Sequence, residues 1–219
     1  MSTHASFTPR APAHLSRRAQ RFVQVHGLSF PRLALQPYRD QWLQQGIPGA
    51  QIDRVADFQN GWGGLALPPA PAYEGGPRIL NADTPEGSTA QGWWFSAGDG
   101  RVSMAYEFAI GPGGEFGLLA DRWTPLHANI HGWVESLALA HHAALWARNI
   151  TKITGEAVDA LDLDAYEPVP EVQGITDNWW RGTDTLVAVY RGEADCLAAP
   201  QCLMAHVYRG LDDWGLRGG

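Results

Sequence analysis

The segment from Phe58 to Leu67 constrains the fold of this chain more than any other. The residues leading into it recur at helical spacing: Ile52, Val55, Ala56 and Phe58. Asn60-Gly61 is a common way to end a helix, and Gly63-Gly64 allows positive φ and close backbone packing. Leu65 and Leu67 then alternate like a short edge strand until prolines stop it. This pattern predicts a helix, a glycine corner and a strand. The residues that define the glycine corner are Phe58, Trp62, Gly63 and Gly64.

Residues 93–120 have the pattern of three antiparallel strands joined by tight turns. Trp93–Phe95 precedes a turn at Ala97–Gly100, and residues 102–108 then alternate between apolar and polar side chains. The turn at Gly111–Gly114 leads into a third strand, Glu115–Ala120.

Further along, Leu126–Arg148 is the longest helical candidate, with Asn129 as its N-cap. Its apolar face is expected to lie on the sheet and to extend as far as Leu145. Thr185–Tyr190 and Cys202–Tyr208 are two further strand candidates. Together these elements predict an α+β fold with an antiparallel sheet of about five or six strands flanked by helices.

The charges divide the chain into three parts. Residues 1–36 form a basic N-terminal arm that is expected to be flexible, although residues 16–26 have the pattern of a short helix with Phe22 and Val23 on one side. Residues 37–149 form the core. Residues 150–219 are a C-terminal extension that carries an acidic segment and two strands, and that packs on the same domain.

The composition limits the class of function. A hydrophobic fraction of 45% supplies a real core, and the net charge of -7 disfavours nucleic acid and suits a basic partner. No apolar run is long enough for a membrane helix, and no signal-peptide pattern is present, so a cytoplasmic protein without membrane contact is expected. Cys196 and Cys202 have neither a disulfide-framework pattern nor metal-ligand spacing, and Cys196 is expected to be a buried or half-buried free thiol.

No sequence motif assigns a catalytic residue or a cofactor. Nucleophile and phosphate-loop signatures are missing. His131, Glu135 and His142 share one helical face, as the ligands of a metal-dependent hydrolase would, but a solvated helix face explains them more simply. His141 lies nearer the apolar side and is expected to pack. A regulatory adaptor or scaffold, with a basic arm that binds an anionic partner, is a second alternative.

The order of these motifs resembles the SMI1/KNR4 family, also called the SUKH superfamily, over about residues 37–146. The segments that resemble it are Ile47-Pro48, Phe58, Trp62-Gly63-Gly64-Leu65, Tyr106–Ile110, Gly113–Gly117, Ala128-Asn129 and Trp133-Val134-Glu135. The resemblance implies an α+β fold without catalysis. Bacterial members are interpreted as immunity proteins that bind and neutralise toxins, often nucleases. The resemblance therefore implies a toxin domain as the protein partner.

The acidic segment is the predicted contact surface. Residues 153–178 hold seven acids and no Lys or Arg. We expect five of these acids to steer a basic partner: Asp159, Asp162, Asp164, Glu167 and Glu171. Trp179 and Trp180 follow, and because adjacent strand residues face opposite ways, one is expected in the core and the other at the contact. The alternatives are a solvated acidic loop and a loop that folds back on the arginines of the arm.

Overall fold

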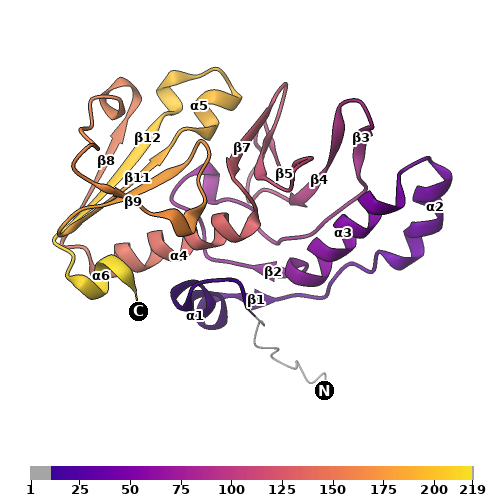
Figure 1. Cartoon of the computed structure of the whole chain (residues 1–219), viewed down its shortest axis with the longest axis horizontal. Helices are drawn as coiled ribbons and strands as arrows, with labels where there is room; N and C mark the ends of the chain where they lie inside the picture. Colours follow the sequence, from indigo (N-terminus) through magenta and orange to yellow (C-terminus); the bar gives the residue numbers. More distant parts are fainter. Residues whose placement is uncertain (1–10, 219) are drawn as a thin grey trace.

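The computed structural model describes residues 11–218 and contains two five-stranded antiparallel sheets that both pack on one long helix, α4 (Figure 1). The predicted α+β fold with helix-flanked antiparallel strands is confirmed, with two such sheets in place of one. A short ribbon, β1 (Leu28–Ser29) paired with β2 (Leu65–Ala66), joins the N-terminal segment to the glycine corner.

The first sheet runs in sequence order from β3 to β7. Its strands are β3 (Glu86–Ser88), β4 (Gly92–Gly98), β5 (Glu107–Ile110), β6 (Phe116–Leu119) and β7 (Trp123–His127). The predicted meander and its turn at residues 111–114 are confirmed. The predicted strand at 102–108 is wrong in its first half, because only Glu107–Ile110 pairs with both neighbours and Val102 is 54% exposed.

Helix α4 (Ile130–Trp146) connects the two sheets. The Asn129 side chain accepts a hydrogen bond from the Gly132 N–H, so the predicted N-cap is confirmed. Leu126 belongs to β7 rather than to the helix. Near the start of α4, Trp133 stacks on Phe116 of the first sheet at a centroid distance of 4.8 Å. In the described part of the chain, no helix is both long and apolar enough to span a bilayer.

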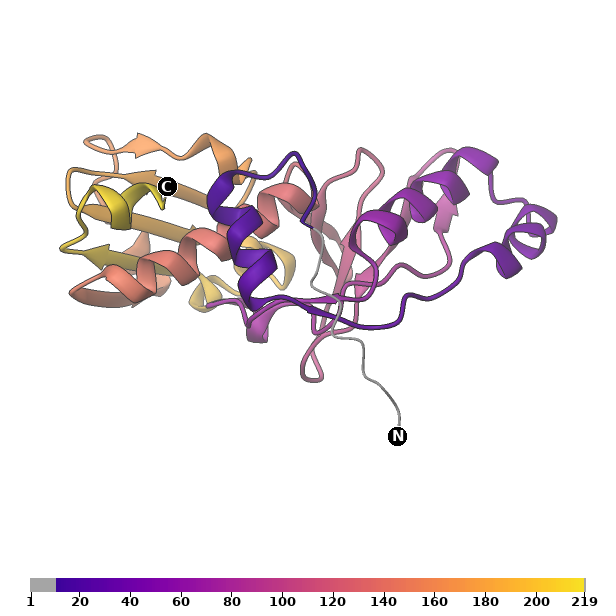
Figure 2. The same ribbon diagram turned by 90° about the horizontal axis from the view of Figure 1, so that it is seen from below.

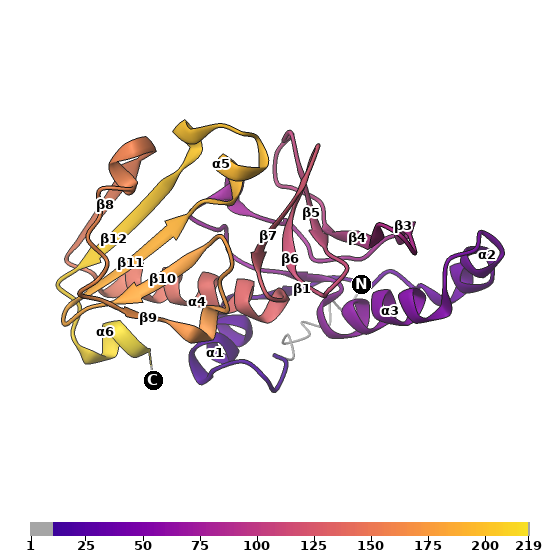
Figure 3. The same cartoon turned by 45° about the horizontal axis from the view of Figure 1, so that its top comes forward.

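The second sheet has the order β8-β12-β11-β10-β9 and lies over the C-terminal part of α4 (Figure 3). Its strands are β8 (Asn149–Thr154), β9 (Glu167–Pro168), β10 (Asn178–Arg181), β11 (Thr185–Tyr190) and β12 (Met204–Arg209). The prediction of β11 is confirmed, and β12 begins two residues later than expected. Two short helices, α5 (Gly192–Cys196) and α6 (Asp213–Arg217), flank this sheet.

The remaining helices lie outside the sheets. Helices α2 (Arg39–Gln44) and α3 (Gly49–Trp62) extend to one side of the first sheet (Figure 1). Helix α1 (Arg17–His26) crosses α4 on the face away from the second sheet (Figure 2). The predicted helix at residues 16–26 is therefore confirmed. The expectation of a flexible arm does not hold for α1, because Phe22 and Val23 are buried against the core.

Candidate functional site

The glycine corner ties three segments of the chain together. Helix α3 does not end at Asn60-Gly61 as predicted; it continues to Trp62, which is buried, and Gly63 caps it. Gly64 has φ +76°, and its N–H donates to the Leu80 carbonyl at 2.8 Å. The Gly64 carbonyl accepts from the Phe30 N–H at 2.7 Å. The corner therefore holds the segment after α1 and the segment at residues 80–82 against the end of α3.

Replacing Gly64 with alanine should lower the free energy of unfolding by about 1–3 kcal/mol, because a Cβ would be strained at this φ. It would also meet the backbone oxygen of Phe30. Gly61→Ala is the matched control, since Gly61 lies within α3 with open space where a Cβ would be added, and helix propensity favours alanine there. Thermal unfolding of both variants measures the difference. Equal melting of Gly64→Ala and the unmodified protein would mean that the corner is not structural.

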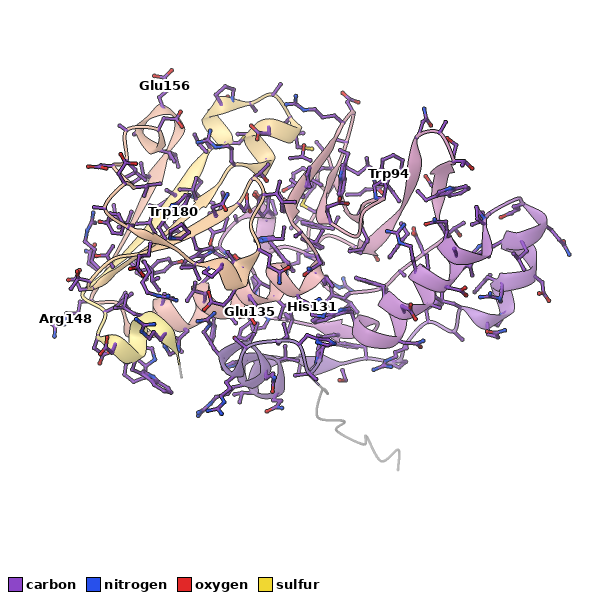
Figure 4. The ribbon with its side chains drawn as sticks, in the orientation of Figure 1. Trp94, His131, Glu135, Arg148, Glu156 and Trp180 are labelled. Atoms are coloured by element: carbon purple, nitrogen blue, oxygen red, sulfur yellow. The ribbon has the colours of Figure 1, made fainter. Side chains whose placement is uncertain are left out.

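The face of α4 that suggested a metal site is occupied by other contacts. Glu135 is 3% exposed and accepts from Arg18 at 3.1 Å and from the Ser16 hydroxyl at 2.7 Å. His131 packs edge-on against Trp62, and a ring nitrogen of His142 lies 2.8 Å from the Trp214 carbonyl. Figure 4 shows His131 and Glu135 along α4, facing α1. The expectation of a solvated face is wrong at Glu135, because α1 covers it.

No group of three or more His, Cys, Asp and Glu side chains among residues 11–218 is arranged to hold a metal ion. His141 packs against Phe22 and His26, as expected of a packed histidine. Cys196 is buried and Cys202 is half-buried, and both are free thiols, which confirms the prediction for Cys196.

The acidic segment covers the outer face of the second sheet. It runs through a 3-10 helix at Gly155–Val158, strand β9 and a second 3-10 helix at Pro170–Val172. Leu161, Leu163 and Tyr166 pack against the small apolar cluster of this face. These side chains therefore hold the segment on the sheet and do not form an exposed apolar surface for a partner.

The carboxylates of the acidic segment, other than that of Asp177, lie at the surface. The five predicted steering acids, Asp159, Asp162, Asp164, Glu167 and Glu171, are all exposed. Asp159 pairs with Arg191 at 2.8 Å, but both side chains are largely exposed, so solvent weakens this pair. Within the described residues, the other four form no ion pair. Together with Glu156, labelled in Figure 4, the five acids make a negatively charged surface, called the acidic face below, and the nearest cation on β10 is Arg181, which lies opposite Glu167.

The two tryptophans of β10 face opposite sides of the sheet, as predicted. Trp179 is 1% exposed, stacks on Tyr208 and donates its indole N–H to the Ser136 hydroxyl of α4 at 2.9 Å. It is therefore unavailable to a partner. Trp180 is half-buried on the outer face, beside the cluster under the acidic segment (Figure 4). Of the two predicted anchors, only Trp180 lies where a partner would reach it.

The basic arm does not neutralise the acidic face within the described residues. Helix α1 lies on α4, and Arg18 pairs with Glu135 rather than with an acid of residues 156–171. Residues 1–10 of the arm lie outside the described part of the chain. The fold-back alternative therefore finds no support from α1.

One of the seven acids of residues 153–178 is buried instead of exposed. Asp177 is fully buried at the junction of the two sheets. It accepts from the Tyr73 hydroxyl at 2.6 Å and from the Arg191 and Gly192 N–H groups at 3.0 and 3.2 Å. Burial raises the pKa of Asp177 to about 7, although these hydrogen bonds act in the opposite direction. Tyr73 itself has φ +58°, and burial raises its pKa too.

This cluster was not predictable from sequence patterns, because Tyr73 and Asp177 are far apart in the chain and each looks like a surface residue in its own segment. The nearest signal was the Pro- and Gly-rich loop around Tyr73, which had to turn sharply. A second buried titratable group lies nearby: burial lowers the pKa of His127 to about 4, and its Nδ1–H donates to the Val172 carbonyl at 2.7 Å.

Comparison with known proteins adds no further information about the site. No family model, no curated protein and no solved structure matches this chain.

Proposed function

We propose that this chain is a non-enzymatic protein-binding module of the immunity type, which neutralises a basic toxin domain by binding it at the acidic face. The observation that supports this most strongly is the exposure of Asp162, Asp164, Glu167 and Glu171 without any cation paired to them in the described residues. Two half-buried leucines, Leu161 and Leu163, and Tyr166 anchor the segment that carries these acids.

This arrangement suits a charged partner for two reasons. Unpaired charges keep their long-range field, which speeds the encounter with an oppositely charged protein. An anchored segment also loses little conformational entropy when it is bound. A nuclease toxin fits this chemistry, because a surface that binds nucleic acid carries Lys and Arg to contact phosphates. The resemblance to the SMI1/KNR4 family supports the same kind of partner.

A neutralisation experiment tests the proposal. The product of the gene adjacent to this one is expressed in a host cell, alone and together with the chain. We expect toxicity alone and growth when the chain is present. Reversal of Asp162, Asp164 and Glu167 to lysine should weaken protection. The matched control reverses three exposed acids that precede α4, Asp57, Glu86 and Asp121, and should protect as well as the unmodified chain. Equal protection by the two triple variants would contradict the role of the acidic face.

A further inference from the structure

Large apolar side chains are exposed together where α1, α4 and α6 meet. Leu145 and Trp146, in the last turn of α4, are 66% and 50% exposed, Val25 of α1 is 62% exposed and Trp214 of α6 is 44% exposed. The expectation that Leu145 lies on the buried face of the helix is therefore wrong. Single exposed apolar residues are ordinary, whereas a cluster of them marks a contact surface.

These residues line a half-open groove of about 260 Å³. From α1 it is lined by Arg18, Arg21, Phe22, Val25 and His26, and from α4 by Ala138, His141, His142, Leu145 and Trp146. Each row has the spacing i, i+3, i+4, i+7, i+8 of one helix face. Trp214 and Gly218 close the remaining side. Two helix faces that line one groove leave room for the side chains of a third helix.

The charge of the groove favours an acidic occupant. Among the described residues, no Asp or Glu lines it, whereas Arg18 and Arg21 do; burial lowers the pKa of His141 and His142, so these two rings add little positive charge. Arg18 is neutralised by Glu135, but Arg21 is exposed and has no ion pair among the described residues. The acids nearest in sequence to its lining residues, Asp212 and Asp213, lie at the start of α6, where Asp212 caps the helix. An occupant with apolar residues on one face and carboxylates at its edges would match both features.

Other occupants fit this groove less well. A two-fold dimer through the groove would join two surfaces that each carry Arg21 and no lining Asp or Glu among the described residues, so it would bring like charges together. The acidic face of a second copy has the right charge, but residues 156–172 expose no large apolar side chain to fill the groove. Residues 1–10 of this chain contain no acid, so they lack the carboxylates that would match Arg21.

We propose that the groove between α1 and α4 binds an acidic amphipathic helix of a partner protein, at a surface separate from the acidic face. The row from Ala138 to Trp146 spans about 12 Å, so the contact covers about two turns of that helix. Trp146 and Trp214 supply the apolar contact, and Arg21 selects for negative charge. This surface does not depend on the acidic face, so either proposal can fail without the other.

Two labelled helical peptides test this inference by fluorescence anisotropy with the full chain. Both carry leucine at i, i+3, i+4 and i+7; one has glutamate at the remaining positions and the other has lysine. We expect the glutamate peptide to bind at least about tenfold more tightly than the lysine peptide. Arg21→Glu should remove this preference, and Leu145→Ser combined with Trp146→Ala should abolish binding.

The matched controls are Arg122→Glu and Leu43→Ser, both exposed and outside the groove, and they should bind like the unmodified protein. Because Arg21 is exposed, its reversal tests the charge preference even if the double variant is unstable. Absence of binding, equal binding of the two peptides, or equal loss in the controls would overturn the inference. Self-association that the double variant abolishes would overturn it in favour of a second copy.

Discussion

Replacing Glu135 with alanine should lower the free energy of unfolding by about 3–5 kcal/mol, because it leaves a buried guanidinium without its counter-charge. Arg18 is 6% exposed, and within residues 11–218 its one further hydrogen-bond partner is the Arg217 carbonyl. The change also removes the acceptor of the Ser16 N–H and hydroxyl, which precede the first turn of α1. We therefore expect α1 to separate from α4, and its amides to lose protection from hydrogen exchange before the second sheet does.

The exposed pair Arg39–Asp53 provides the matched control for this prediction. Its two charges lie 2.8 Å apart, but the Asp53 side chain is 61% exposed. Asp53→Ala should therefore change stability by less than about 1 kcal/mol. If chemical denaturation gives equal losses for Glu135→Ala and Asp53→Ala, α1 is not held by the buried pair.

Replacing Asp177 with alanine should lower the free energy of unfolding by about 3 kcal/mol, because it leaves several buried donors unpaired. These are the Tyr73 hydroxyl and the Arg191 and Gly192 N–H groups. Asp177→Asn should cost much less, because the amide offers one acceptor and one donor in the same place. A similar loss in both variants would mean that both carboxyl oxygens are needed as acceptors and that an amide of the same shape cannot replace them.

The same carboxyl predicts a pH dependence. Its pKa is raised from 3.8 to about 7, so the folded state binds this proton more tightly than the unfolded state does. The stability that the carboxyl contributes is complete below pH 3.8 and is lost as the pH rises through about 7. The unmodified protein should therefore lose stability relative to Asp177→Asn over this range. Other titrating groups, such as His127, are present in both proteins, so their effect on the pH dependence of stability cancels when the two are compared. A constant difference across the range would contradict the prediction.

Local signals made part of the fold predictable. Asn129 caps α4, the glycines at 111–114 form the turn between β5 and β6, and the apolar run of β11 begins and ends as expected. Each of these depends on residues that lie close together in the sequence. The fold class followed because the strand patterns and the helix patterns were each locally clear.

The errors arose where distant segments meet. A helical wheel places Glu135 on a polar face, but only the docking of α1 decides whether that face meets water. Asp177 belongs to an acidic run by composition, yet Tyr73, 104 positions earlier, gives it a buried partner. The periodicity of α4 continues through Leu145, but the helix extends past the side chains that would cover its last turn. Periodicity identifies a face and does not show which part of it finds a partner.

The acidic face was predictable as a run of charge, and its structure refines the proposal. The apolar residues of the acidic segment pack against the second sheet, and Trp179 lies in the core. The groups left to contact a partner are the exposed carboxylates and Trp180. Such a surface should act mainly on the rate of association, since exposed charges steer a partner more than they hold it.

The association rate of the chain with the product of the adjacent gene tests this account most directly. Stopped-flow measurements compare the unmodified protein with the variant in which Asp162, Asp164 and Glu167 are lysine, and with the control variant at Asp57, Glu86 and Asp121. At low salt we expect the first variant to associate at least about tenfold more slowly, with the difference largely removed above about 0.15 M salt. Its melting temperature should stay unchanged. Equal association rates for the two variants, or equal salt dependence, would contradict the claim that the acidic face binds a basic partner.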